Sequence, residues 1–475
     1  MTTSAKKFLE NIDNSGAEFV DFRFTDTNGT WHHVTYHAKA LSEEMITKGI
    51  TFDGSSIHGW RSIEDSDMIM IPDITSAVTD QLCEQPTLIV NCDIYDPHTN
   101  KPYDRDPRST AKQAEKYLIK TGIADTAYFG PEPEFFIFDD IHFDVSPQST
   151  FYSINHTEGI NPKGLVYVQK DIQPYSQGHK PIRGGGYFPV QPVDSGFDLR
   201  SEIVTMLNLM GLESDKHHHE VAQAQHEIGF KYAGLTKTAD NLQLFKYIVK
   251  NVAHLNGRTA TFMPKPIYGD NGSGMHVHMS LWKDNKALFY GDKYNDLSDT
   301  ALFFIGGILK HARTINAFTN PTTNSYKRLV PGFEAPVYKA YSARNRSVAV
   351  RIPHVTNNNA KRIEARFPDP AANSYLGLSA MLMAGIDGIQ NKIHPGEAMD
   401  KNLFDPAELA LGNHHVLCKS LQEALIELNN DREFLLAGDV FTNSQIDAYI
   451  ALKEEEVIKF SQAPHPIEFQ MYYST

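Results

Sequence analysis

The segment Phe129-Gly130-Pro131-Glu132-Pro133-Glu134-Phe135-Phe136 places two glutamates one residue apart inside an aromatic, β-prone run. Because successive side chains of a strand point to opposite faces, Glu132 and Glu134 share one face, and Pro133 and Phe135 share the other. Two carboxylates aimed into one space beside phenylalanines are costly to bury unless a cation lies between them. The segment therefore indicates a divalent metal site. A solvated edge strand is the alternative, and its prolines favour an edge.

The same two-residue spacing recurs in two later runs that also predict strands, His276-Val277-His278 and Glu364-Ala365-Arg366. The histidine pair follows a glycine-rich turn, residues 269–274, which would permit close backbone approach to a ligand. Satisfied core histidines after a plain hairpin turn are the alternative. The recurrence nevertheless favours metal ligands on several strands.

A histidine-rich segment, His217-His218-His219-Glu220, is followed by Gln225-His226-Glu227. Three histidines suggest zinc, but adjacent strand residues cannot all face one metal. We therefore expect Glu220 and Glu227 to be the ligands. Solvated polar loops with a helix-capping role are the alternative.

Basic residues concentrate between positions 327 and 366, where they alternate with Glu334 and Glu364: Lys327, Arg328, Arg344, Arg346, Arg351, Lys361, Arg362 and Arg366. In a chain of net charge −14, this density indicates anion binding, since guanidinium groups suit carboxylates and phosphates. Internal ion pairs are the alternative. Glutamates with one histidine form a hard ligand set that favours Mg²⁺ or Mn²⁺ over zinc. Metals, arginines and glycine-rich turns together suggest phosphoryl transfer.

The chain has 475 residues, enough for two or three domains, and its negative charge disfavours nucleic acid or an anionic membrane as a general partner. Three scattered cysteines, which we interpret as buried small hydrophobes, fit a reducing cytoplasm. The N-terminus has no apolar stretch of signal-peptide length. The apolar run 375–386 is too short to cross a bilayer and predicts a buried helix.

Short alternating runs such as 19–24 and 87–90, with a turn at Asn28-Gly29, predict a small β-rich domain over about residues 15–100. After a boundary at 103–108, Ser109 could cap a helix to about Lys120 that ends at Gly122. Further on, strands mix with helices over 241–254 and 299–318, and residues 141–182 predict a long loop. The expected fold class is α+β.

Long motifs identify a resemblance to type I, bacterial glutamine synthetase along essentially the whole chain. They are the residues 52–56 (FDGSS), 130–136, 265–280, 320–332 (NPTTNSYKRLVPG), 362–364 (RIE) and 366–370 (RFPDP). The resemblance implies a β-grasp domain, residues 16–100, and a catalytic domain, residues 108–475, whose antiparallel strands form a metal-lined funnel surrounded by helices. It also implies a cytoplasmic dodecamer of two stacked hexamers with active sites between subunits.

The implied reaction phosphorylates the γ-carboxylate of L-glutamate with ATP, after which ammonia displaces phosphate to give L-glutamine. The resemblance implies a tighter metal site of Glu134, Glu220 and Glu227, and a nucleotide-side metal site of Glu132, His276 and Glu364. It implies catalytic roles for Asp53, supplied by the adjacent subunit, and for Glu334 and Arg346. Implied glutamate and ammonium contacts are Ser56, Tyr187, Asn271, Gly272, Arg328, Glu334, Arg346 and Arg366, and implied ATP contacts are Asp215, Tyr232, His278, Ser280, Arg346 and Arg351.

This chain departs from the enteric members at several positions. Asp215 replaces an expected Glu, Asn359 an expected Lys and Phe333 an expected Tyr. The spacing from Glu220 to Glu227 is one residue shorter than in the enteric enzymes. Phe404 replaces the tyrosine that receives AMP in those enzymes, so we expect no adenylylation at this loop. The alternatives are a γ-glutamyl-amine ligase with a larger amine substrate, which the presence of Asp53 and Tyr187 disfavours, and a catalytically silent relative.

Overall fold

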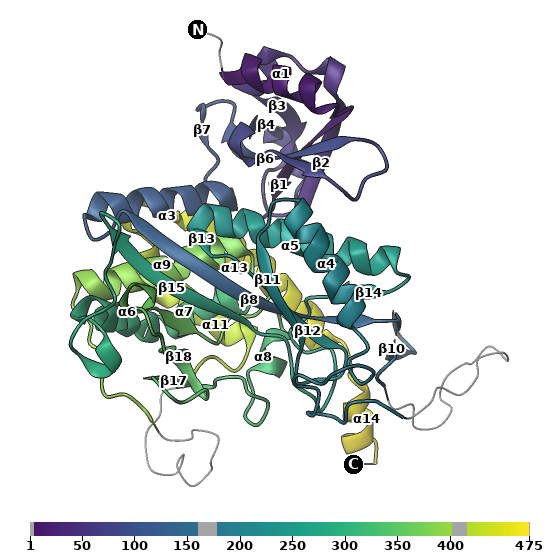
Figure 1. The fold of residues 1–475 in the computed structure, drawn as a ribbon, viewed down its shortest axis with the longest axis vertical. Helices are drawn as coiled ribbons and strands as arrows, with labels where there is room; N and C mark the ends of the chain where they lie inside the picture. Colours follow the sequence, from purple (N-terminus) through teal and green to yellow (C-terminus); the bar gives the residue numbers. More distant parts are fainter. Residues whose placement is uncertain (1–3, 160–177, 401–415, 475) are drawn as a thin grey trace, which may run out of the picture.

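The computed structural model describes residues 4–159, 178–400 and 416–474. A small N-terminal domain lies above a larger C-terminal domain, and the two chain ends lie at opposite poles of the molecule (Figure 1). The N-terminal domain carries helices α1 (Ser4–Ser15) and α2 (Glu43–Lys48). Its strands are β1 (Phe19–Thr25), β2 (Trp31–His37), β3 (Ile50–Asp53), β4 (Asp67–Pro72), β5 (Val78–Asp80), β6 (Thr87–Asp96) and β7 (Lys101–Pro102).

These strands form one sheet in the order β2-β1-β6-β4-β3, with β5 and β7 also paired to β6. The pair β1 and β6 is parallel, and the other pairs are antiparallel. Phe22, Val90 and Met68 are fully buried in its core. The predicted strands at 19–24 and 87–90 are confirmed, as is the turn at Gly29, whose φ of 88° favours glycine.

The larger domain is organised around a sheet in the order β11-β12-β8-β15-β19-β18-β17. Its main strands are β8 (Thr126–Phe138), β11 (Ser214–His219), β12 (Gln225–Phe230), β15 (Met275–Lys283), β17 (Tyr338–Ser342), β18 (Val348–Arg351) and β19 (Ile363–Ala365). Short strands β13 (Ala233–Gly234) and β14 (Thr259–Thr261) pair with β8, and β16 (Lys286–Ala287) pairs with β15. All described pairs are antiparallel except β17 with β18.

Strand β8 is central, so the edge-strand alternative is wrong. The Glu134 N–H donates to Gly274 O on the β15 side of the strand. Because backbone groups alternate in direction along a strand, the backbone nitrogens of Pro131 and Pro133 point to the other side of β8. There β13 pairs only with residues 128–129 and β12 only with residues 134–136. The prolines thus occupy a stretch of β8 where no described ladder needs their missing N–H.

Helices surround this sheet (Figure 1). They are α3 (Pro107–Thr121), α4 (Phe197–Leu209), α5 (Leu235–Leu255), α6 (Asp299–Lys310), α7 (Ala312–Thr319), α8 (Ser325–Arg328), α9 (Ser374–Gln390), α11 (Leu421–Asn430), α12 (Glu433–Leu436), α13 (Asn443–Gln462) and α14 (Pro466–Tyr472). The predicted buried helix at 375–386 is confirmed as α9, and 241–254 lies within α5. Among the described residues, no helix has the length and apolar character needed to cross a membrane.

The alternation of β15 explains how the sheet serves both core and surface. Val277 and Met279 are buried in the main hydrophobic core and Met275 in a second core cluster, whereas His276 and His278 point to the opposite face. The carboxylates of β8 share that second face. One face of the sheet therefore builds the core and the other is free for chemistry.

Two helix predictions need correction. Asp106 rather than Ser109 is the N-cap of α3, because its carboxylate accepts from the Arg108 and Ser109 N–H groups. The predicted helix 299–318 is two helices, since His311 takes a non-helical conformation (φ −91°, ψ 7°) between α6 and α7. Its buried imidazole lies 2.9 Å from Asp387 and 2.7 Å from Asp431, which hold it in this position.

Two further predictions are wrong in part. Within the predicted loop 141–182, strands β9 (Asp140–Val145) and β10 (Thr150–Asn155) form an antiparallel hairpin, and residues 160–177 lie outside the described residues. Cys92 and Cys418 are buried as expected, but Cys83 is exposed, and its thiol donates to Asp80.

The two domains are joined by Arg108 at the start of α3, whose side chain is only 4% exposed. It contacts Asp73 at 2.8 Å and Asp93 at 2.6 Å in the N-terminal domain. It also contacts Asp240 of α5 at 2.9 Å. A buried cation shared by both domains fixes their relative position, because separating them would leave its charge unpaired.

Candidate active site

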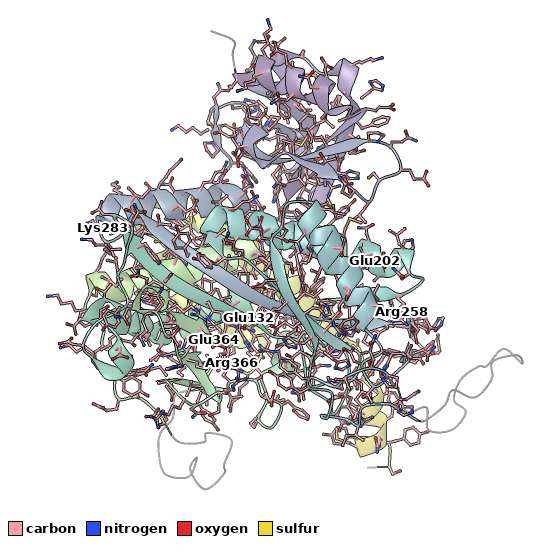
Figure 2. The ribbon with its side chains drawn as sticks, viewed as in Figure 1. Glu132, Glu202, Arg258, Lys283, Glu364 and Arg366 are labelled. Atoms are coloured by element: carbon pink, nitrogen blue, oxygen red, sulfur yellow. The ribbon has the colours of Figure 1, made fainter. Side chains whose placement is uncertain are left out.

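A cavity of about 340 Å³ lies on the free face of the large sheet. Its walls carry acidic, histidine and arginine side chains from strands far apart in the sequence, among them Glu132, Glu364 and Arg366, which gather at the centre of the domain (Figure 2). It brings together these predicted site residues: Glu132, Glu134, Tyr187, Glu220, Glu227, Asn271, Gly272, His276, His278, Arg328, Glu334, Arg346, Arg351, Glu364 and Arg366.

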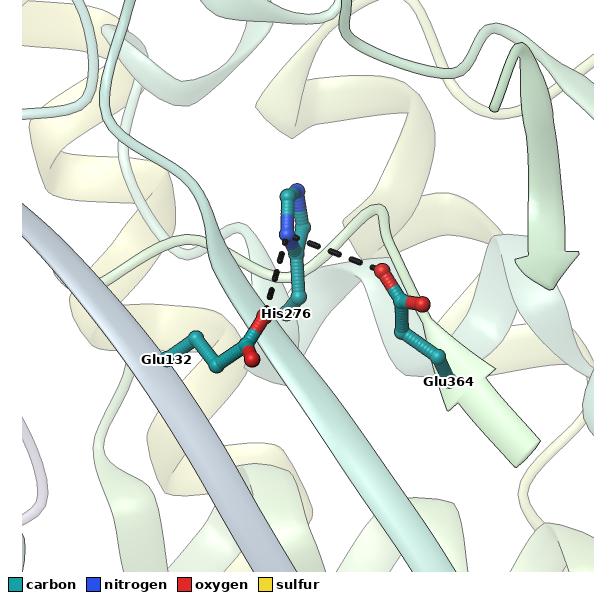
Figure 3. Close-up of side chains that lie close together, drawn as sticks. All are labelled: Glu132, His276 and Glu364. Carbon is teal, nitrogen blue, oxygen red and sulfur yellow. Dashed lines mark ion pairs between the residues drawn. The ribbon is translucent and has the colours of Figure 1, made fainter. Parts of the chain in front are cut away.

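The first ligand cluster is formed by Glu132, His276 and Glu364. His276 Nδ1 lies 3.8 Å from Glu132 and 3.7 Å from Glu364, between the two carboxylates (Figure 3). The register explains the arrangement, because Glu132 on β8 lies directly opposite His276 on β15. Glu364 on β19 is opposite His278, one alternate residue further along β15.

The electrostatics of this cluster keep its carboxylates ionised. Burial raises the pKa of Glu132, but hydrogen bonds to His276 and His278 outweigh burial and hold that pKa well below its usual range. Burial also opposes ionisation of Glu364, but His276, when protonated, and Arg366 lower its pKa. Burial, together with Arg366, lowers the pKa of His276. A neutral imidazole between two carboxylates is the protonation state that a metal ligand requires.

The second ligand cluster is formed by His218, Glu220 and Glu227. His218 lies 3.5 Å from Glu220 and 3.3 Å from Glu227. Strand register again brings distant residues into one row, since Glu227 on β12 is opposite both His218 on β11 and Glu134 on β8. The solvated-loop alternative for this segment is wrong, because every residue of β12 is buried.

Glu134 adds a third acidic group to this row. Burial and the charges of Glu220 and Glu227 raise the pKa of Glu134 well above its usual value. Burial and the charge of Glu227 raise the pKa of Glu220 to about 7. Mutual repulsion of this strength is relieved when a cation lies among the carboxylates.

The residues present therefore fit two divalent cations. Each cluster offers ligand atoms within 4.8 Å of one another, and each set consists of carboxylate oxygens with one imidazole, which suits Mg²⁺ or Mn²⁺. The ammonium of Lys216 lies 3.8 Å from both Glu132 and Glu227. A protein cation thus already bridges the two clusters.

Sequence reasoning missed three residues of this site. It rejected the histidine triplet as a whole, but β-strand alternation leaves His218 alone facing the cavity, with Lys216 on the same face. Gln225 donates to Glu134 at 2.7 Å and to Gly272 O at 3.1 Å. Gln225 lies two residues before Glu227, and this strand spacing, which puts both side chains on one face, is the sequence signal that could have identified it.

The arginines divide into two kinds. Arg351 and Arg366 both pair with the 1% exposed Glu364, so the ion-pair alternative holds for them. The buried Arg328 donates to the backbone oxygens of Arg366, Phe367 and Pro368. All three still line the cavity, as does Arg346. The cavity therefore combines cation ligands with several positive side chains, as a phosphoryl-transfer site requires.

The loop that carries Glu334 lies at the side of the cavity. Glu334 has a φ of 59°, a strained value for a residue other than glycine, and accepts from Asn271 at 3.4 Å. Lys265 lies 3.8 Å from the centre of the Phe333 ring. The aromatic replacement at 333 thus contacts the segment before Asn271.

Five predicted site residues do not line the cavity of their own chain: Asp53, Ser56, Asp215, Tyr232 and Ser280. Asp53 ends β3 in the N-terminal domain, where it is exposed and accepts hydrogen bonds from Ser55 and Ser56. Asn359 lies in an exposed turn. Phe404 lies outside the described residues.

Comparison with known proteins agrees with this geometry. Residues 104–472 match the family model "Glutamine synthetase, catalytic domain", and residues 16–97 match "Glutamine synthetase, beta-Grasp domain". The chain is 56% identical to glutamine synthetase of Azospirillum brasilense over 469 residues, covering 98% of this chain and 99% of the relative. It is 54% identical over 475 residues to a protein named 3-hydroxylaminophenol mutase from Cupriavidus pinatubonensis, with both chains fully covered.

A solved structure of Plasmodium falciparum glutamine synthetase has a TM-score of 0.90 and 30% identity, and 99% of each chain is covered. Both the β-grasp domain and the catalytic domain predicted from the sequence are therefore confirmed, and so is the α+β class. With its whole length accounted for by these matches, the chain belongs to the glutamine synthetase family.

Proposed function

We propose that this protein ligates ammonia to the γ-carboxylate of L-glutamate through γ-glutamyl phosphate, releasing L-glutamine, ADP and phosphate from ATP. The observation that carries this proposal is the pair of ligand clusters that face one arginine-lined cavity. Family membership supports the same reaction. A silent relative would be expected to lose ligands, whereas Glu132, Glu134, Glu220, Glu227, His276 and Glu364 all line the cavity.

Divalent Mg²⁺ or Mn²⁺ ions, when bound, would neutralise the ATP phosphates and the γ-carboxylate. Glu132, His276 and Glu364 would hold the nucleotide-side ion, and Glu134, Glu220 and Glu227 the other, with His218 beside it. We assign the ATP contacts to Asp215, Tyr232, His278, Ser280 and Arg351. Arg346 would offset charge on the moving phosphoryl group, and Arg366 supports it by donating to Arg346 O at 3.1 Å.

Glutamate would bind between Asn271, Gly272, Arg328 and Arg366, because these groups present donors beside the second cluster. Glu334 lies 3.4 Å from Asn271, so the loop that carries it is placed to cover a bound glutamate and exclude water from the acyl phosphate. Exclusion of water is needed because hydrolysis would waste the intermediate.

Ammonium would be bound by Asp53 and Ser56 of a neighbouring subunit, with Tyr187 and Glu220 of this chain. Hydrogen bonds from Ser55 and Ser56 lower the pKa of Asp53, which favours the ionised form that attracts a cation. Since Asp53 does not line the cavity of its own chain, an active site shared between subunits of a dodecamer accounts for its position. We further propose domain limits of 16–100 and 108–475 and a cytoplasmic location, in keeping with three free cysteines.

The test is incubation of the purified protein with ATP, Mg²⁺ and L-glutamate, with and without ammonium, followed by separate assays of glutamine and phosphate. We expect glutamine to form only with ammonium, in equal amount to phosphate. Parallel reactions with methylamine and ethylamine distinguish the amine-ligase alternative, which would be supported if an alkylamine were used faster than ammonium. Absence of any ligation product would overturn the proposal.

A further inference from the structure

A second cavity, of about 530 Å³, lies between the N-terminal domain and α5. We call it the interdomain cavity. One wall is the turn Asn28–Trp31, and another is α5 with Lys246, Tyr247 and Lys250; the remaining lining includes Phe262, Met263, Pro264 and Asn324. None of these residues belongs to the proposed catalytic site. Its volume lies within the range of small-molecule sites.

Two lysines one helical turn apart face this cavity. Lys246 and Lys250 lie 5.7 Å and 5.9 Å from the centre of the Phe262 ring. The Lys246 ammonium donates only a long bond, 3.5 Å, to Ala372 O, and in the part of the chain that the structure describes neither lysine pairs with a carboxylate. Burial and the charge of Lys250 lower the pKa of Lys246 to about 8, and burial lowers that of Lys250. Two like charges at this spacing are unfavourable without an anion.

The turn Asn28–Trp31 carries unsatisfied polar atoms. The buried Trp31 Nε1 and the buried Asn28 Oδ1 have no hydrogen-bond partner among the described residues. An unpaired buried donor or acceptor costs roughly 1–3 kcal/mol, a cost that a bound water, ion or ligand can relieve. Both residues line the interdomain cavity, as the lysines do.

The cavity is held open by bonds that do not involve a ligand. Gln243 donates to Thr25 and to Gly29 O, at 2.9 Å and 3.1 Å. Asn373 donates to the backbone oxygens of Asp26 and Thr27. These bonds fix the turn against the larger domain, so the two walls are positioned before any ligand arrives.

The interdomain cavity also shares a wall with the candidate active site. Pro264 O accepts from the Ser273 N–H at 2.8 Å. A side chain at Gly272 would lie 2.3 Å from that oxygen, so the backbones are in close contact. Asn324, which lines the interdomain cavity, exchanges two hydrogen bonds with the Lys265 backbone, at 2.7 Å and 3.0 Å. Displacement of residues 262–265 would therefore move Gly272, which lines the active-site cavity.

We propose that the interdomain cavity binds a small organic anion, whose carboxylate or phosphate group lies between Lys246 and Lys250 and whose apolar body packs against Phe262 and Trp31. Binding there would change the position of the loop that carries Asn271 and Gly272. The binding step is independent of the proposed function, whereas the effect on glutamate binding rests on it.

Lysine labelling of the intact, full-length oligomer tests the binding step. Near pH 8, an acetylating reagent should modify Lys246 and Lys250, as measured by peptide mass spectrometry. If phenyl phosphate binds with a Kd of about 1 mM, then about 10 mM should slow labelling of both about tenfold. Benzoate should protect too, and inorganic phosphate, which has no apolar body, should protect less; together they distinguish carboxylate, phosphate ester and bare phosphate ligands. Lys237, exposed on the same helix, is the internal control.

Two outcomes would overturn the proposal. In one, phenyl phosphate and benzoate at constant ionic strength protect neither lysine more than Lys237. In the other, Lys246 reacts only after unfolding, which would show that a neighbouring subunit closes the cavity. Lys250→Gln, at an exposed position, should remove the protection of Lys246, whereas the matched control Lys237→Gln should not.

Glutamate kinetics test the coupling. Phenyl phosphate should change KM for glutamate in the wild type and in Lys237→Gln but not in Lys246→Gln or Lys250→Gln. Protection without any change in KM would support the binding site and refute the coupling. Protection in a protein that makes no glutamine would refute the proposed function and leave the binding site standing.

Discussion

Replacement of Glu364 by glutamine is the sharpest test of the first ligand cluster. The carboxylate is 1% exposed, belongs to the cluster with Glu132 and His276, and pairs with Arg351 and Arg366. Alanine would leave the buried Arg366 without its carboxylate, and breaking such a pair costs about 3–5 kcal/mol. Glutamine keeps the shape and one acceptor oxygen, so we expect a smaller loss of roughly 1–3 kcal/mol.

The expected effect on turnover is larger than the effect on stability. A catalytic cation contributes several kcal/mol to charge stabilisation, so its loss should lower kcat about 10³-fold or more, at 1.36 kcal/mol per tenfold change in rate. Circular dichroism should show a folded protein. Titration with Mn²⁺, followed by electron paramagnetic resonance, should show one class of sites weakened while the class assigned to Glu134, Glu220 and Glu227 is retained.

The matched control is Glu213→Gln, since Glu213 is exposed and pairs only with Lys231 among the described residues. It should leave turnover and Mn²⁺ binding unchanged. A folded Glu364→Gln protein with near-normal turnover and both classes of Mn²⁺ site intact would refute the assignment of Glu364 as a ligand.

Four further predictions follow from the same structure. Mixed oligomers of the inactive variants Asp53→Ala and Arg346→Ala should regain partial activity because some interfaces contain one intact shared site; inactive hybrids of verified composition would refute the shared site. In metal-free protein, Glu220 should contribute a loss of stability on the order of 3 kcal/mol as pH rises from about 4.5 through 7, because the folded state holds its proton more tightly than the unfolded state. Thermal unfolding against pH should show the loss abolished by Mn²⁺ and smaller in Glu220→Gln, in which Glu134 still has a raised pKa; an unchanged slope in that variant would contradict the assignment. Arg108→Met should lower the free energy of unfolding by about 3–5 kcal/mol, because the buried Asp240 loses its partner. The double variant with Asp240→Asn should recover part of this stability, since no charge is then left unpaired. Denaturant unfolding measures both variants, and additive losses of stability would count against the pairing. An enteric adenylyltransferase with labelled ATP should label only Phe404→Tyr, since phenylalanine has no hydroxyl to accept AMP, and label on residues 401–406 of the native chain would disprove this.

Much of the candidate site could be predicted from local sequence because strand alternation is a local property. Glu132 with Glu134, His276 with His278, and Glu364 with Arg366 each share a face for the same steric reason, whatever the rest of the chain does. Helix α9 was predictable for a similar reason, since a long apolar run of that length must be buried. The N-cap of α3 was not, because Asp106 and Ser109 are both good caps and only the observed bonds distinguish them.

By itself, then, the sequence determined which residues of each strand face the same way, the family and the hard character of the ligand set. The tertiary structure decided which strands lie side by side. The register of β8 with β12 and β15 makes Glu134 a neighbour of Glu227, and Glu132 a neighbour of His276. The register of β11 with β12 adds His218, from a triplet that local reasoning had rejected. The tertiary structure also brought the turn Asn28–Trp31 to the lysines of α5, more than 200 positions away. The reason is physical: the direction of a side chain follows from local backbone geometry, whereas partners distant in the sequence are selected by the burial of the whole core.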